Sequence, residues 1–294
     1  PIEDIEKSAD LHWNNMLQSM RIWLSYTTSH RLIEALNELY AYLKQSHKDN
    51  GLLDKGYHRF SHSLEVADLA FVTAIKKGYP YEAVLEMFVA GLLHDYDPRK
   101  PYQAPKVINT IHHLRNDSRI LEIVNNAGID MERIILLIRG TDFPMKEEQS
   151  GAIESGIKMI EKQNPGIAQR LREEVKFLGL IDKAATYIHL NITPQESELR
   201  VRELAQEIGI EAKVMLVGTP KFFKDFLEKD VDELIALLGE AYEMQWHMIR
   251  QHFVDTANYI KEQAERNATS SPIRESPINV NGPVTASLFN PNNT

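Results

Sequence analysis

The chain contains the segment Glu86-Met87-Phe88-Val89-Ala90-Gly91-Leu92-Leu93-His94-Asp95. Two ionisable side chains end an apolar run, which predicts a buried helix from about residue 81 to residue 96. Pro98 lacks a backbone N–H group and restricts the residue before it, so the helix is expected to stop here. Burying His94 and Asp95 unpaired would cost free energy, which a bound cation would offset. Because both residue types bind divalent cations, the pair is a candidate half of a metal site.

Two further histidines lie upstream, in the sequence Tyr57-His58-Arg59-Phe60-Ser61-His62. Apolar residues recur at steps of three and four from residue 57 to residue 77, which predicts an amphipathic helix. His58 and His62 are four residues apart, so this helix would place both imidazoles on one face, about 40° apart. A lone histidine is more often an ordinary surface or core residue, but the spacing and the second cluster favour a shared site.

The remaining ligand is expected to be an acidic residue that interrupts apolar helical sequence. Asp182 fits best, because it lies within Val175-Lys176-Phe177-Leu178-Gly179-Leu180-Ile181-Asp182-Lys183-Ala184-Ala185-Thr186-Tyr187-Ile188. The alternative is an exposed aspartate paired with Lys183 or with a neighbouring helix.

The order of these residues resembles the signature of the HD domain phosphohydrolases, which is a histidine, a His-Asp doublet and a distant aspartate. The matching positions are His62, His94, Asp95 and Asp182. The resemblance covers roughly residues 50 to 190 and implies an HD domain bundle of helices that holds a divalent metal. Tyr57-His58 and Asp97-Pro98 look more like the branch that includes cyclic nucleotide phosphodiesterases.

The resemblance implies a role for each matching residue. His62, His94, Asp95 and Asp182 would bind the metal, and His58 would be a proton donor that does not bind it. Phosphodiester hydrolysis needs a strong nucleophile, neutralisation of charge at phosphorus and a proton for the leaving group. A divalent cation supplies the first two, and Asp95 has a second oxygen that could bridge another ion. His58 suits the third because imidazole titrates near neutrality. One or two ions of Mn, Mg, Fe or Zn are expected.

Several weaker candidates for substrate binding or support of the ligands follow the His-Asp pair. Asp97 is either a support for the ligands or a simple turn residue before proline. Arg99 and Lys100 are placed to hold a small anionic substrate, and a solvated turn is the alternative.

Two later dipeptides are also candidates. One of His112 and His113 is expected to line the site, since a comparable pair in the phosphodiesterase branch lies near the metals; exposed helix histidines are the alternative. Thr141 and Asp142 resemble a substrate-pocket position of that branch, although a loop that ends one helix and starts another explains them equally well.

Two functions of different class follow. The first is a metal-dependent phosphohydrolase, with a phosphodiester of a small nucleotide or cyclic nucleotide as substrate. The segment Asp97-Pro98-Arg99-Lys100 departs from the His-Pro-Gly that usually follows the carboxylate in the cyclic nucleotide branch, so a phosphate ester is the broader expectation. The second is a non-catalytic module of the same fold that senses a ligand or binds a partner.

Composition narrows the setting. The chain has 294 residues, of which 43% are hydrophobic, so it can bury a large core. The absence of cysteine excludes disulfides and thiolate ligands. A net charge of -9 argues against a broad nucleic-acid surface, whereas a small phosphorylated substrate needs only local basic groups. No apolar run approaches the 18 residues of a membrane span and no targeting segment is evident, so a cytoplasmic protein is expected.

Helical periodicity dominates the whole sequence and predicts an all-α protein. The predicted helices lie near residues 3–25, 28–47, 57–78, 81–96, 104–115, 117–127, 130–140, 146–163, 166–190, 195–208, 211–217, 220–228 and 231–266. We expect three regions: an N-terminal helix over 1–26, a phosphohydrolase domain over 27–266 and a disordered tail over 267–294, where Ser, Pro, Asn and Thr replace large apolar residues.

The N-terminal helix over 1–26 carries an apolar stripe that includes Trp23. Because the chain begins with Pro1 and not with methionine, this helix is a candidate for pairing in a homodimer or for a connection to an upstream domain. Packing on its own domain is the alternative.

Overall fold

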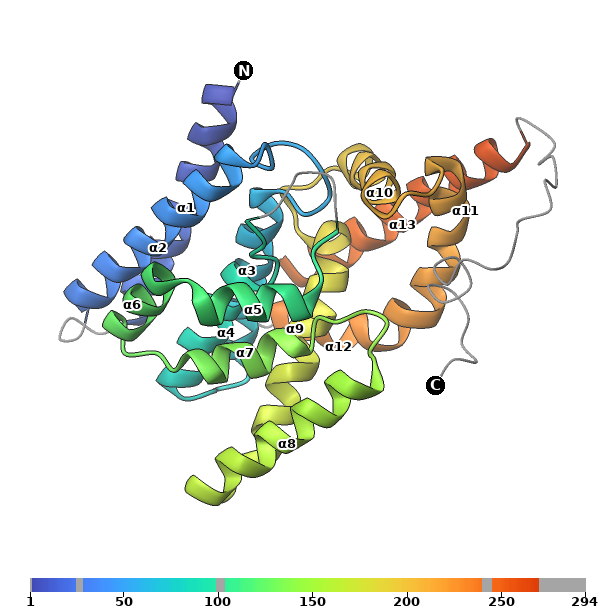
Figure 1. The fold of residues 1–294 in the computed structure, drawn as a ribbon. Helices are drawn as coiled ribbons and strands as arrows, with labels where there is room; N and C mark the ends of the chain where they lie inside the picture. The colour runs from blue at the N-terminus through green and yellow to red at the C-terminus, as the bar shows by residue number, and fades with distance from the viewer. Residues whose placement is uncertain (1, 25–28, 99–103, 240–244, 270–294) are drawn as a thin grey trace. The chain divides into compact units, whose positions relative to one another are not determined.

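The computed structural model describes residues 2–24, 29–98, 104–239 and 245–269 (Figure 1). Regular structure in these residues consists of α-helices and one π-helical turn, with no β-strand, so the all-α prediction is confirmed. The chain divides into two compact units, Pro1–Asp182 and Lys183–Thr294, and the division falls within one helix. None of the described helices is both long enough and apolar enough to span a bilayer.

The first unit contains the candidate site. Its helices are α1 (Ile2–Trp23), α2 (Ser29–Asp49), α3 (Phe60–Lys76), α4 (Tyr81–Leu93), α5 (Val107–Asn116), α6 (Ser118–Asn126), α7 (Met131–Arg139), α8 (Glu147–Gln163) and most of α9 (Ala168–Ile188).

The buried helix α4 is the centre of this unit. Every residue from Ala83 to Leu93 is buried, which explains why its sequence is apolar on all sides and not on one stripe. Helix α3 packs directly on α4, and their backbones approach closely at Gly91. A Cβ atom at Gly91 would lie 2.7 Å from the Cα atom of Ala67, so only glycine allows this approach.

A similar close approach joins α7 to α9. A Cβ atom at Gly179 would overlap the carbonyl oxygen of Gly140, the residue that follows α7. Gly91 precedes His94 by one helical turn, and Gly179 precedes Asp182 by one turn. Glycine contacts therefore allow close packing of α4, which ends just before His94, and of α9, which carries Asp182.

Helix α1 packs on its own unit. The Trp13 ring stacks on Tyr40 of α2 with 4.6 Å between the ring centroids, and its Nε1 donates to Asn37 Oδ1 at 2.9 Å. Asp10 accepts hydrogen bonds from Tyr40 and Lys44. These contacts agree with the intramolecular alternative for the N-terminal helix.

The second unit contains the end of α9 together with α10 (Pro194–Ile208), α11 (Ala212–Phe222), the π-helical turn η1 (Phe223–Leu227), α12 (Glu228–Gly239) and α13 (Gln245–Thr269). The prediction of one helix over 231–266 is wrong, because α12 and α13 pack against each other and so are separate helices. The predicted break near residues 218–219 is also wrong, since α11 continues past Pro220 into η1.

Two further boundaries differ from expectation. Asn267–Thr269, expected to begin a disordered tail, form the last residues of α13, where Asn267 Nδ2 and Thr269 Oγ1 donate to carbonyls of the preceding turn. The rest of the predicted tail lies outside the described residues. The division into regions at 1–26 and 27–266 stays a prediction.

Candidate metal centre

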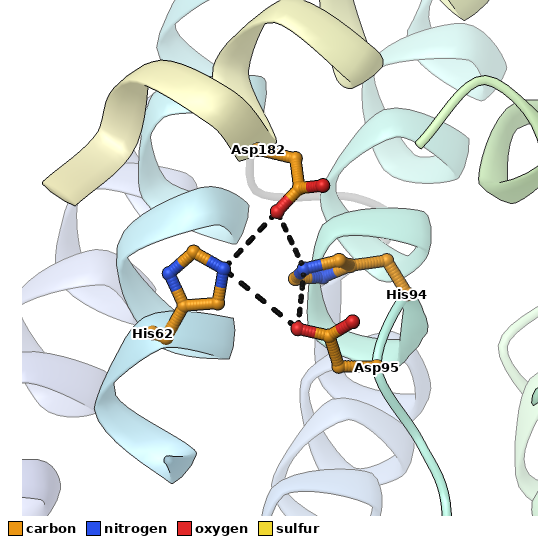
Figure 2. A group of neighbouring side chains, drawn as sticks. All are labelled: His62, His94, Asp95 and Asp182. Atoms are coloured by element: carbon orange, nitrogen blue, oxygen red, sulfur yellow. Dashed lines mark hydrogen bonds and ion pairs between the residues drawn. The ribbon is translucent and has the colours of Figure 1, made fainter. Parts of the chain in front are cut away.

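Four side chains from α3, the end of α4 and α9 converge on one point (Figure 2). His62 Nε2 lies 3.1 Å from Asp182 Oδ1 and 3.7 Å from Asp95 Oδ2. His94 Nε2 lies 2.9 Å from Asp95 Oδ2 and 3.2 Å from Asp182 Oδ1. All four ligand atoms lie within 4.8 Å of one another. The structure thus brings together the four residues that the sequence singled out as metal ligands.

These separations are those expected around a single cation. Metal–nitrogen and metal–oxygen bonds of about 2.1 Å place neighbouring ligand atoms about 3.0 to 3.4 Å apart in octahedral or tetrahedral geometry. Three of the four distances lie within about 0.2 Å of that range, and the fourth is 3.7 Å. The cluster therefore needs little movement to surround an ion.

The orientation of His94 favours a metal over a pair of hydrogen bonds. Its Nδ1 lies 2.8 Å from the carbonyl oxygen of Gly91, one of the last carbonyls of α4, which have no partner inside the helix. This contact fixes a proton on Nδ1, so Nε2 is the nitrogen that would lose its proton and direct a lone pair into the cluster when an ion binds.

Two buried atoms at the centre lack hydrogen bonds. His94 Nε2 and Asp95 Oδ2 have no hydrogen-bond partner within the described residues, although they lie 2.9 Å apart, because their directions do not suit such a bond. Buried polar atoms are normally satisfied, so atoms that point to a common centre and not at each other fit a cation between them. The four side chains could together hold a metal ion.

The charges in the cluster are strongly coupled to one another. Burial alone would lower the pKa of His94, but the carboxylates of Asp95 and Asp182 outweigh it and raise that pKa well above its usual value. Burial alone would raise the pKa of Asp182, but His94 and His62 lower it far below its usual range. His94 and His58 likewise lower the pKa of Asp95 against the effect of burial. Both carboxylates are thus held ionised, as cation binding requires.

His58 lies beside this cluster but outside helix α3, so the predicted helix start at residue 57 is wrong. Arg59 has an extended backbone, with φ −73° and ψ 165°, and α3 begins at Phe60. The two histidines are therefore not on one helical face. The His58 and His62 rings are nevertheless 6.1 Å apart, and Tyr57 lies 5.0 Å from each of them. His58 is close enough to influence Asp95 without being one of the four converging ligands.

Among the weaker candidates, Asp97 and His113 come together. His113 Nε2 of α5 lies 3.4 Å from Asp97 Oδ1, which ties α5 to the loop that carries the ligands. His112 is exposed, which agrees with the alternative of an ordinary helix histidine. Arg99 and Lys100 lie outside the described residues.

Thr141 and Asp142 have local contacts. Thr141 Oγ1 donates to the carbonyl of Ile138 at 2.8 Å, and Asp142 lies 4.0 Å from Lys146 Nζ. Burial raises the pKa of Asp142, while Lys146 opposes the shift. These contacts at the end of α7 agree with the loop alternative.

A buried histidine near the cluster was missed in the sequence. His47, in the last turn of α2, has its Nδ1 2.8 Å from the carbonyl of Leu43 and its ring 5.0 Å from that of Phe60. Burial lowers its pKa, and Asp95 and His94 shift it further in opposite directions, so His47 lies within electrostatic range of the ligands. The sequence did contain a signal that His47 is buried: His47 is four residues after Leu43 and so continues the apolar stripe of α2.

Comparison with known proteins gives no identification. No protein-family model matches the chain. A search of curated proteins likewise finds no match for it.

Proposed function

We propose that this protein is a metal-dependent hydrolase of a phosphate ester. One observation carries the proposal: four buried or half-buried His and Asp ligand atoms lie within 4.8 Å of one another, with a fifth ionisable side chain, His58, next to them. A purely structural cluster would need no separate proton donor beside it. The HD domain resemblance assigns the same residues to the same roles.

The side chains divide the chemistry among them. His62, His94, Asp95 and Asp182 would hold the ion, which when bound supplies Lewis acidity for activating water and neutralising charge at phosphorus. His58 would donate a proton to the leaving oxygen, since imidazole titrates near neutrality.

The donor set bears on the metal and on the substrate. The two imidazoles suit Zn or Fe, and the two carboxylates suit Mn or Mg. We propose that the site holds one or two ions from the set Mn, Mg, Fe and Zn, each of which matches part of this mixed donor set. The substrate class is a phosphodiester of a small nucleotide, cyclic nucleotides included.

The direct test combines elemental analysis of the purified protein with a panel of substrates. The panel contains cyclic nucleotides, linear nucleotides and an aryl phosphodiester, each assayed with added Mn, Mg, Fe or Zn. We expect bound metal and metal-dependent turnover, and loss of both in Asp95→Ala. Undiminished turnover in that variant would contradict the proposal. Bound metal without turnover of any ester would favour the sensing or binding module.

The role of His58 has its own test. In His58→Gln, we expect kcat to fall by about 10² to 10⁴, the usual contribution of general acid catalysis, while bound metal stays at the wild-type level. His30→Gln is the control, because the His30 side chain on α2 is 90% exposed and its ion pair is with Glu34, one turn along the same helix. Loss of metal in His58→Gln would make His58 a ligand and not a proton donor.

A further inference from the structure

One carboxylate outside the ligand set accepts hydrogen bonds from three parts of the first unit. Asp117 Oδ1 accepts from the backbone N–H groups of Arg119 and Ile120, both at 3.0 Å, and so caps α6. Asp117 Oδ2 accepts from the hydroxyl of Tyr42 at 2.9 Å and from the hydroxyl of Tyr96 at 2.8 Å. A helix cap needs only the first oxygen, so the two tyrosine bonds require another explanation.

Tyr96 connects this carboxylate to the candidate metal centre. It directly follows the ligands His94 and Asp95, its side chain is buried, and its backbone N–H donates to the carbonyl of Leu93 at 3.0 Å. Asp95 is thus flanked by the end of α4 on one side and by an anchored tyrosine on the other. Tyr42 approaches the same carboxylate from α2 and its hydroxyl also interacts with that of Tyr96, but unlike Tyr96 it is not adjacent to a ligand in the sequence.

A second contact anchors the same loop to the same part of the fold. Asp97 Oδ1 lies 3.4 Å from His113 Nε2, and His113 is in the last turn of α5, just before Asp117. The ligand pair His94-Asp95 is therefore followed by two consecutive attachments to the junction of α5 and α6. A loop held at two points loses little conformational entropy when its ligands bind an ion.

We propose that Asp117, acting through the hydroxyl of Tyr96, is a positioning residue that orients Asp95 toward the cation. This inference rests on the metal centre proposed above. Partners outside the ligand set typically contribute about 10-fold to 100-fold to metal affinity, because they fix the direction of a ligand that would otherwise sample several rotamers. Tyr42 would contribute to packing of α2 on α6 and not to metal binding.

The test compares two matched substitutions, Tyr96→Phe and Tyr42→Phe, in the full chain, using Mn²⁺ titrated by calorimetry. Each removes one phenol hydroxyl from the same carboxylate oxygen and keeps the ring. We expect Tyr96→Phe to weaken Mn²⁺ affinity by about 10-fold, and Tyr42→Phe to change it by less than about 2-fold. Similar melting temperatures of the two variants would separate positioning from general stability.

Asp117→Asn keeps a side-chain oxygen for the α6 cap but cannot accept the same pair of phenol bonds, so it gives an independent measurement. We expect it to weaken Mn²⁺ binding as Tyr96→Phe does, and the double variant Tyr96→Phe/Asp117→Asn to be no weaker than either single variant. Equal effects of Tyr96→Phe and Tyr42→Phe on affinity, or no effect of either, would overturn the positioning role. Failure of the wild-type protein to bind Mn²⁺ would instead overturn the centre itself, and the positioning role with it.

Discussion

The first unit contains two buried clusters of charged side chains that differ in how their charge is balanced. In the first, Glu86 pairs with Arg133 at 2.8 Å and Glu174 pairs with Arg170 at 2.9 Å. We call these four residues the arginine–glutamate cluster. The second cluster is the set of four candidate metal ligands. Within the described residues, the ion-pair partners of Asp95 and Asp182 are histidines.

This difference separates a structural charge cluster from a metal centre. Arginine is always charged, and each glutamate of the arginine–glutamate cluster lies 2.8 or 2.9 Å from a guanidinium nitrogen, so the charges of that cluster balance without an added ion. Imidazole can be neutral, and in the second cluster the Nε2 atom of each histidine lies near both carboxylates and not near one alone. A buried set of acids with histidine partners therefore has a place for an added cation, and one with arginine partners does not.

The largest effect is expected from breaking the second cluster. In Asp182→Asn, metal affinity should fall by more than about 100-fold, beyond the usual loss for a residue outside the ligand set, because one charged ligand is removed. Bound metal by elemental analysis and the rise in melting temperature on adding Mn²⁺ measure this. Glu174→Gln is the control from the arginine–glutamate cluster and should retain metal binding. Equal metal loss in both variants would remove the distinction between the clusters.

A smaller effect is expected from the backbone contact that places the ligands. Gly91→Ala would press a Cβ atom against the Ala67 backbone, which no side-chain rotation relieves, so the free energy of unfolding should drop by about 1 to 3 kcal/mol. Denaturant unfolding measures it.

Gly151→Ala in α8 is the matched control. Outside its own helix backbone, no atom of the described residues lies within 4 Å of the added Cβ, and alanine favours a helix over glycine, so this variant should gain up to about 1 kcal/mol. A Gly91→Ala protein as stable as Gly151→Ala would contradict the close approach of α3 and α4.

An effect of similar size, confined to a window of pH, concerns the arginine–glutamate cluster. Burial raises the pKa of Glu86 and of Glu174 to about 7 from 4.5, although Arg133 and Arg170 oppose the shift. The folded protein then holds more protons than the unfolded chain between these values, so the free energy of unfolding falls as pH rises through this window. In Glu174→Gln, the fall in the free energy of unfolding between pH 5 and pH 7.5 should be smaller by about 1 to 3 kcal/mol.

The neighbouring Glu173→Gln gives the control for that slope. Burial would raise the pKa of Glu173, but hydrogen bonds from Gln169 and the charge of Lys77 lower it instead. Its contribution to stability is therefore present above pH 4.5 and lost only as pH falls below that value. Unfolding curves from pH 5 to pH 7.5 should keep the wild-type slope in this variant, and an equal change in both variants would contradict the assignment to Glu174.

The four converging residues could be predicted from the sequence because they contrast with the apolar helical stretches around them. Ionisable residues inside apolar helical stretches, such as His94 and Asp182, are too costly to bury without a partner, so they stand out from the pattern. The same argument failed at His58, because the extended backbone of Arg59 carries no periodic signal. The sequence pattern also failed at residues 231–266, where helical periodicity continues along the sequence although α12 and α13 are separate helices that pack against each other.

Other features depend on contacts between segments far apart in the chain. From the sequence, Asp117 would be interpreted as an ordinary helix cap. Its hydrogen bonds to Tyr42 and Tyr96 depend on how α2, α6 and the residues after His94-Asp95 pack together. Glu86 and Glu174 lie on apolar helices as Asp182 does, and the sequence does not reveal that their partners are Arg133 and Arg170. Residue type marks a buried charge, whereas packing decides what neutralises it.

Gly91 combines two tasks, and this limits how the centre could be moved to another protein. Because Gly91 has no Cβ atom, α3 can pack closely on α4. The Gly91 carbonyl also accepts a hydrogen bond from the Nδ1–H group of His94, which selects the tautomer of that imidazole. A designer who grafts the four ligands onto a different helical bundle would therefore have to graft a backbone feature too. Copying side chains alone would leave the histidine free to rotate and to present either nitrogen.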